Sequence, residues 1–169
     1  EFRRVLFRSN GGGYLAVSTT GGLLMSNTGQ LVLVGNSTIS NSVNVILNGL
    51  VTTNGVNSGT LVKTGPGTVF LTNLVNNSFD GGTSNGAGVI IAAGGTNTVT
   101  GAFVTNPLGT GPITISLATN IFLTDTNVVL GGVSGYNVTA PSNALVTVGL
   151  RSAPGAGVLS NMTVTLGAL

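Results

Sequence analysis

The chain has 169 residues, of which 5% are charged and 41% are hydrophobic, and it contains 28 Gly but no Cys, His or Trp. Without His and Cys, the usual nucleophile–base pairs and zinc sites of ordinary composition cannot be built. The abundance of Val, Thr, Gly, Asn and Ser, with a single Lys, Glu and Gln, favours strands and turns over helices.

The formal net charge of +2 comes from the first eight residues, which hold Glu1, Arg3, Arg4 and Arg8. The charges in the rest of the chain balance one another: Lys63, Arg151, Asp80 and Asp125. Phosphate recognition needs clustered Lys and Arg, so we expect no nucleic-acid partner. No apolar run approaches the roughly 20 residues of a membrane helix, so we expect no membrane insertion by this segment.

The first nine residues, Glu1–Ser9, read EFRRVLFRS and resemble translated sequencing adapter. A targeting signal is the competing interpretation, because Arg3-Arg4 precede an apolar stretch. A signal needs roughly 7–15 apolar residues, however, and Arg8 interrupts this stretch after Val5-Leu6-Phe7. We therefore expect residues 1–9 to be non-native and residues 10–169 to be a fragment of a longer native chain.

Short apolar runs separated by Gly, Asn and Ser recur along this body, and many neighbours start about 8–12 residues apart. Strands are predicted at Tyr14–Ser18, Leu23–Met25, Leu31–Val34, Val43–Leu47, Thr60–Val62, Thr68–Leu71, Val89–Ala92, Ile113–Leu117, Ile121–Thr124, Val128–Leu130, Ala144–Val148 and Met162–Leu166. This spacing indicates an all-β sandwich, barrel or solenoid.

Alternation inside the runs favours the solenoid. Ile113, Ile115 and Leu117 flank Thr114 and Ser116, so one face of the strand is apolar and the other polar. The outward residues are expected to be neutral Thr, Ser and Asn, which can stack in ladders without repelling one another. We predict a parallel β-helix of about five to seven coils of roughly 25 residues, with a β-sandwich as the alternative.

An ordered pattern of glycines and turn residues occupies residues 59–92. Its members are Gly59, Leu61, Lys63, Gly65, Gly67, Thr68, Leu71, Asn77, Phe79, Gly81, Gly82, Thr83 and Gly88. With the Leu108-Gly109-Thr110-Gly111 element in residues 106–114, the pattern resembles the autotransporter-associated β-strand repeat of bacterial surface proteins, with Phe79 in place of the usual Tyr. The resemblance implies a right-handed parallel β-helix, exported through the outer membrane and exposed at the cell surface, with a structural role.

Several side chains in this pattern carry specific expectations. Leu61, Val69 and Leu71 are candidate inward residues, and Phe79 can fill a corner of the coil. Asp80 is expected to cap its turn as an Asx-type residue. Lys63 is expected to be a solvated strand residue whose stem covers apolar surface.

These observations leave three functional hypotheses. The first is a structural spacer whose partners are the neighbouring coils of the same full-length chain, with no catalytic residue, cofactor or metal. The second is an adhesin segment that binds host or matrix glycans or proteins. The third is a polysaccharide-active β-helix enzyme, which requires Asp80 and Asp125 to lie within about 10 Å of each other. Uncapped terminal coils would also favour edge-to-edge association.

Overall fold

The computed structural model describes residues 14–17, 25–27, 30–53, 55, 58–72, 76–97, 99–141, 143–151 and 164–165. The adapter-like residues 1–9 lie outside this part of the chain. The described residues form strands and turns and contain no α-helix, as the composition predicts. No helix long and apolar enough to cross a membrane is present in the described part.

Two six-stranded parallel sheets form the body of the molecule. The first sheet contains β1 (Tyr14–Val17), β4 (Gly35–Asn41), β7 (Gly59–Thr64), β9 (Gly82–Asn85), β13 (Ile113–Ile115) and β16 (Val138–Thr139). The second sheet contains β2 (Met25–Asn27), β5 (Val45–Leu47), β8 (Thr68–Leu71), β10 (Gly88–Ala93), β14 (Ala118–Thr124) and β17 (Leu145–Leu150). Strands alternate between the sheets along the chain, so each pair of strands belongs to one coil.

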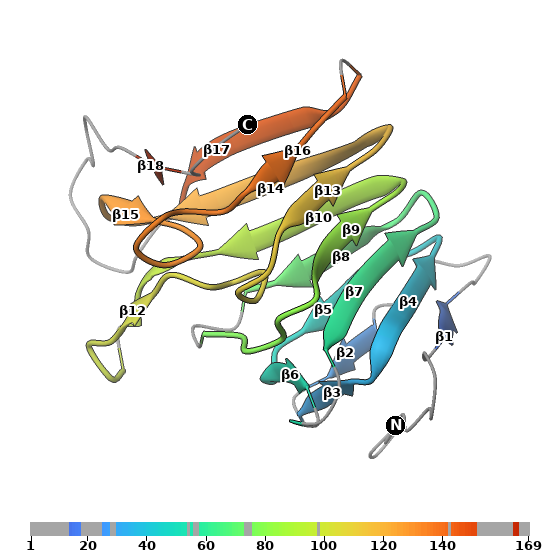
Figure 1. Ribbon diagram of the computed structural model, residues 1–169, viewed down its shortest axis with the longest axis horizontal. Helices are drawn as coiled ribbons and strands as arrows, with labels where there is room; N and C mark the ends of the chain where they lie inside the picture. The colour runs from blue at the N-terminus through green and yellow to red at the C-terminus, as the bar shows by residue number, and fades with distance from the viewer. Residues whose placement is uncertain are drawn as a thin grey trace.

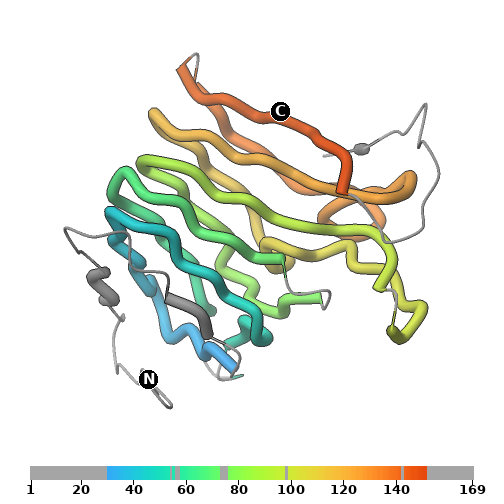
Figure 2. Tube along the Cα trace, turned by 180° about the vertical axis from the view of Figure 1, so that it is seen from behind, coloured from blue at the N-terminus to red at the C-terminus, as the bar shows by residue number. Residues whose placement is uncertain are grey.

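The coils wind as a right-handed parallel β-solenoid of about five turns. In Figure 1 the strands of the first sheet run upward in front, those of the second sheet return behind, and the chain advances toward the upper left. Figure 2 shows the second sheet from its outer side. The parallel pairing excludes the β-sandwich alternative, because a Greek-key sandwich is built from antiparallel strands.

A third side closes each coil and is less regular. It contains the parallel pairs β3 (Leu31–Leu33) with β6 (Val51–Thr53) and β15 (Val128–Val129) with β18 (Val164–Thr165), and the antiparallel hairpin of β11 (Gly95–Thr96) with β12 (Phe103–Val104). The hairpin lengthens its coil to 30 residues, from Thr83 to its register partner Ile113. Outside this coil, register partners in the two main sheets are 20–26 residues apart.

The core is made of inward side chains stacked in register from coil to coil. One row runs through Val45, Val69 and Ile90, and all three side chains are buried. Leu61 and Leu71 are also buried, which confirms the predicted inward positions. Each coil therefore covers the apolar side chains of the coil before it, so the coils bury their core by stacking.

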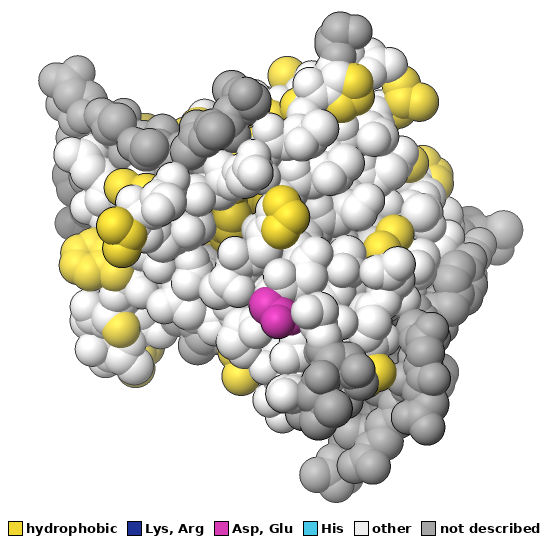
Figure 3. Space-filling view, in the orientation of Figure 1, with side chains coloured by type: hydrophobic (Ala, Val, Ile, Leu, Met, Phe, Trp, Pro, Cys, Tyr) yellow, Lys and Arg dark blue, Asp and Glu magenta, His cyan; other side chains and the backbone are white. Residues whose placement is uncertain are grey.

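The predicted polar outer surface is correct for the first sheet only. Thr38, Ser84 and Thr114 point outward from that sheet. The face in Figure 3 shows scattered hydrophobic side chains, an isolated acidic spot and no basic side chain among the described residues. The prediction is wrong for the second sheet, where Ile46 and Phe70 occupy outward positions. β5 and β10 are nearly continuous apolar runs, so alternation supplies no polar residue to their outer face, whereas β8 and β14 have Thr68 and Thr119 at outward positions.

Candidate functional site

Lys63 is the most unusual side chain of the pattern, because it lies entirely inside the solenoid. It occupies an inward position on β7 and has 0% exposure, so the expectation of a solvated lysine is wrong. Nζ donates hydrogen bonds to the carbonyl oxygens of Gly65 at 2.8 Å and Ala87 at 2.7 Å. The lysine thus joins the turn that follows its own strand to the equivalent turn of the next coil.

Burial sets the proton affinity of this amine. Removal from water disfavours the charged form and lowers the pKa of Lys63 from 10.5 to about 8. A lysine with a lowered pKa can serve as a base or nucleophile when it faces a cleft. Lys63 has no exposed surface and both of its partners are backbone carbonyls, so this geometry gives it a bridging role.

Two asparagines repeat the bridge in the neighbouring coils, and we refer to Asn41, Lys63 and Asn85 as the corner column. Asn41 donates through Nδ2 to the carbonyls of Val43 at 2.7 Å and Thr68 at 3.1 Å. Asn85, the register partner of Lys63, donates through Nδ2 to the carbonyl of Thr119 at 3.0 Å. Each member therefore bonds to the coil that follows it.

The pattern glycines allow the turns at this corner to approach one another closely. A Cβ on Gly65 would lie 2.5 Å from the carbonyl oxygen of Asn41, and a Cβ on Gly67 would lie 2.4 Å from that of Val43. Gly88 meets the same obstacle one coil later, since its Cβ would lie 2.5 Å from the oxygen of Gly67. Glycine is required here because side chains would push adjacent coils apart.

The same requirement holds for the glycines at the start of the first-sheet strands. A Cβ on Gly59 would lie 2.7 Å from Cβ of Leu33, and one on Gly81 would lie 2.4 Å from Oγ1 of Thr60. Gly82 has a φ of 90°, and its Cβ would lie within 2.2 Å of the oxygen of Pro112. The pattern therefore marks positions where the backbones of successive coils touch.

Asn77 and Phe79 stabilise the opposite corner, where the third side leads into the first sheet. Oδ1 of Asn77 accepts from the amide of Val51 at 2.9 Å, and Nδ2 donates to the carbonyl of Pro107 at 2.7 Å. One buried side chain thus joins three coils. Phe79 has 0% exposure, which confirms that it fills this corner.

The Leu108-Gly109 element packs directly on this corner. Thr83 donates through Oγ1 to the carbonyl of Leu108 at 3.2 Å, and a Cβ on Gly109 would lie 2.7 Å from the ring of Phe79. The two parts of the sequence pattern, residues 59–92 and 106–114, are therefore stacked on one another in successive coils.

Tyr136, from the following coil, also packs at this corner, a role that was not predicted from the sequence. Its hydroxyl accepts from the amide of Leu108 at 2.9 Å and donates to the carbonyl of Gly109 at 3.2 Å. Burial raises the pKa of Tyr136 well above its ordinary value, against a smaller lowering by the Leu108 amide. Its ring stacks with Phe122 at a centroid distance of 6.3 Å.

Asp80 caps a turn, but the turn belongs to the preceding coil. Oδ1 accepts from the amide of Gly59 at 3.2 Å, and Oδ2 accepts from the hydroxyl of Ser58 at 3.3 Å. The expected Asx-type contact within its own turn is replaced by contacts between coils. Asp80 is exposed, so its carboxylate remains accessible to solvent.

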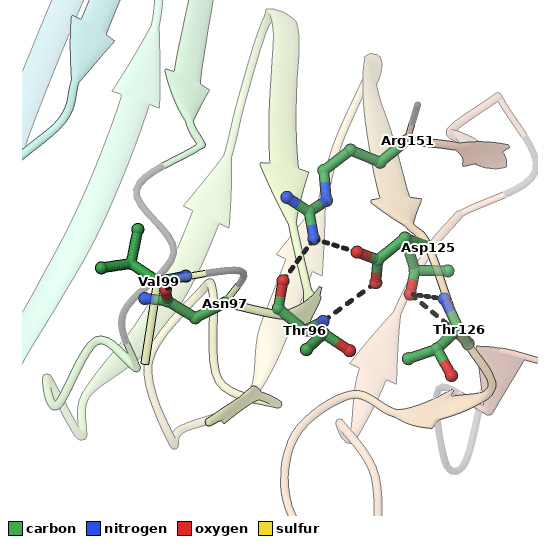
Figure 4. Close-up of polar contacts among 7 residues, drawn as sticks. Thr96, Asn97, Val99, Asp125, Thr126 and Arg151 are labelled. Atoms are coloured by element: carbon green, nitrogen blue, oxygen red, sulfur yellow. Dashed lines mark hydrogen bonds and ion pairs between the residues drawn. The ribbon is translucent and has the colours of Figure 1, made fainter. Parts of the chain in front are cut away.

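Asp125 lies at a different corner and is held by Arg151 (Figure 4). Oδ2 is 2.5 Å from the guanidinium NH2 group, and Oδ1 accepts from the amide of Thr96 at 2.9 Å. The same guanidinium group donates to the carbonyl of Thr96 at 2.8 Å. This network joins three successive coils through β11, the end of β14 and the end of β17.

The two carboxylates needed for glycoside hydrolysis therefore have separate partners. Asp80 precedes β9 and binds the turn at Gly59, whereas Asp125 follows β14 and is paired with Arg151. The described residues hold no group of three or more His, Cys, Asp or Glu side chains that could bind a metal ion. Comparison of the chain with models of protein families, with curated proteins and with solved structures gave no match.

Proposed function

We propose that this chain is a structural spacer segment of a bacterial autotransporter-like passenger region that is displayed at the cell surface. The observation that carries the proposal is that the polar side chains of the pattern bond between coils. Lys63 and Asn77 are buried and join adjacent turns, and Asp80 joins its turn to the preceding coil. Such contacts between coils stiffen the stack, which is the property that a spacer needs.

The enzyme hypothesis has less support. The nucleophilic amine of Lys63 is enclosed, and the carboxylate of Asp125 is neutralised by Arg151. A polysaccharide panel incubated with the purified chain should release no reducing ends. Turnover that is lost in both Asp80→Asn and Asp125→Asn would replace the spacer proposal with the hydrolase.

The spacer proposal can be tested through the length of the molecule. Neighbouring strands lie about 4.8 Å apart, so five turns extend the axis by about 24 Å. Two and three tandem copies measured by small-angle X-ray scattering should lengthen by about this amount for each added copy. Tandem copies that collapse into a globule of unchanged length would contradict the proposal.

Surface display needs its own experiment. The full chain would be placed between a secretion signal and an outer-membrane barrel, with an epitope at its outer end, and digested with protease on intact cells. We expect display of the wild type and of Gly86→Ala, whose Cβ would meet only ordinary contacts, and loss of display in Gly67→Val. Equal display of both variants would show that the coil stack is not needed.

A further inference from the structure

The outer side of the second sheet carries a row of large apolar side chains in exact register between strands. Ile46 pairs with Phe70, Phe70 with Ile91, and Ile91 with Ile121. All four alternate with buried inward residues and keep partial exposure. Val89 and Leu123 flank the row at other outward positions. We call these six residues the apolar outer face.

This face differs chemically from the opposite side of the solenoid. The register-matched outward row of the first sheet runs through Thr38, Val62, Ser84 and Thr114, so it is mainly hydroxyl-bearing. The second-sheet strands contain no charged residue at all. In Figure 2 these strands lie side by side, and no described strand crosses their outer side.

An apolar sheet face of this kind is usually covered. Parallel strands that are nearly continuous apolar runs are typical of sheets buried on both faces. Contiguous apolar patches of several hundred square ångströms on soluble proteins mark interaction sites. The inner side of the second sheet is filled by the solenoid core, so the outer side is the one that lacks a partner within the described chain.

The chemistry of the face selects its partner. Binding to a lipid surface relies on Lys or Arg beside apolar residues, and the second-sheet strands have neither. Glycan binding needs several polar groups to orient the sugar, and the row from Ile46 to Ile121 offers none. The outward hydroxyls lie at its margins, on Thr68, Thr119 and Thr147. A flat, uncharged, apolar sheet fits another flat apolar sheet, as in face-to-face sheet packing about 10 Å apart.

We propose that the apolar outer face binds the same face of a second copy, giving a closed two-fold dimer of back-to-back solenoids. The face carries no charge, so identical copies meet without repulsion, and a two-fold axis lets one patch serve both partners. The four strands β5, β8, β10 and β14, about 4.8 Å apart and with three to seven residues of about 3.3 Å each, give about 300 Å² per copy.

This area predicts a weak dimer. Stable interfaces bury about 800 Å² per partner, and smaller ones belong to transient complexes. Copies held on one surface would still associate, because tethering raises their effective concentration. The proposal does not depend on the spacer function, since the face and its partner are both properties of the isolated chain.

Sedimentation velocity of the full chain from about 10 μM to about 1 mM, the range in which a weak dimer associates, tests the dimer. The wild type should approach a dimer and stop there. Ile91→Lys should weaken association at least tenfold, because it places two charges in the interface. Val62→Lys is the matched control, since Val62 is an outward residue of the neighbouring sheet and should leave association unchanged. Circular dichroism would confirm that both variants keep their strands.

A second variant covers the case in which Ile91→Lys fails to fold. The chain has no Cys, so Ile91→Cys introduces the single thiol of the protein. A homobifunctional maleimide that spans about 10 Å, the separation of face-to-face sheets, should cross-link the Ile91→Cys dimer, and Val62→Cys should stay uncrosslinked. Equal cross-linking of the two variants would contradict the interface.

Three other outcomes would overturn the proposal. The first is a monomer at every concentration. The second is association that survives Ile91→Lys but is lost in Val148→Lys, because Val148 lies on the edge strand β17 and would report end-to-end stacking. The third is growth beyond the dimer, which a closed two-fold contact does not allow.

Discussion

A Cβ on Gly88 would lie 2.7 Å from Nζ of Lys63, because the ammonium group bonds to the carbonyl of Ala87, the residue directly before the glycine. The lysine and the glycine of the sequence pattern are thus two parts of one contact between coils. The space that the glycine leaves open is the space that lets the lysine stay buried with both hydrogen bonds.

Gly88→Ala should destabilise the solenoid. The added methyl group meets the oxygens of Gly65 and Gly67 as well as Nζ of Lys63, and the φ of 72° is unfavourable for alanine. Together these effects should lower the free energy of unfolding by about 2 kcal/mol or more. Urea denaturation measures the loss, with Gly86→Ala as the control, because its Cβ would meet no atom closer than 3.5 Å. Equal midpoints for the two variants would contradict the argument.

Stability should rise with pH above neutrality because of Lys63. Its pKa is about 8 in the folded chain and 10.5 in the unfolded chain, so between these values the unfolded chain binds more protons. Raising the pH from 7 to about 9.5 should therefore add about 2 kcal/mol to the free energy of unfolding.

Lys63→Met provides the control for this pH dependence, since it removes the amine and keeps a long apolar stem. The free energy of unfolding of this variant should not rise between pH 7 and 9.5. Measurements should stop below pH 10, where Tyr136 acts in the opposite direction: its raised folded-state pKa makes the unfolded chain lose protons first. A wild-type chain that becomes less stable between pH 7 and 9.5 would show that Lys63 is not desolvated.

The sequence predicts the strands of the second sheet better than those of the first. Thr68–Leu71 is predicted with its observed bounds, because Val69 and Leu71 are strongly apolar. β4 (Gly35–Asn41) and β9 (Gly82–Asn85) are not predicted, since their inward positions include Asn41, Thr83 and Asn85. These strands pair through their backbones and the corner column, which a hydrophobic pattern does not detect.

The burial of Lys63 was not predicted from the sequence for a related reason. A lone lysine between Val62 and Thr64 fits a solvated strand residue, and only the alternation from Leu61 places it inward. Its acceptors include Ala87, which belongs to the next coil and becomes a neighbour only through the register of β7 with β9. The inward position of Lys63 could be predicted from the two-residue period of the strand. Its acceptor Ala87 could be identified only from the three-dimensional stack of coils.

The ion pair of Asp125 and Arg151 should contribute measurably to stability. Asp125→Asn would weaken the bond to the guanidinium group, and Arg151→Met would leave the carboxylate without its counter-charge. We expect each to cost about 1–3 kcal/mol, with a favourable coupling energy in the double-mutant cycle. Thermal and urea unfolding would give the four values.

Asp80→Asn is the matched control for that cycle, since Asp80 also accepts a hydrogen bond from a backbone amide but is exposed to solvent. Its loss should be below about 1 kcal/mol, because exposed polar contacts are weak. A larger loss at Asp80 than at Asp125 would mean that the described network at β14 does not hold the coils together.

Tyr136→Phe should weaken the corner that holds the Leu108-Gly109 element. Loss of the hydroxyl leaves the amide of Leu108 and the carbonyl of Gly109 buried without their shared partner. An unpaired buried group costs about 1–3 kcal/mol, and the ring contact with Phe122 is kept, so the loss should come from the hydrogen bonds alone. Hydrogen exchange should quicken at Leu108 while the Val69 amide, in the neighbouring sheet, stays protected. Unchanged exchange at Leu108 would show that the hydroxyl does not hold this turn.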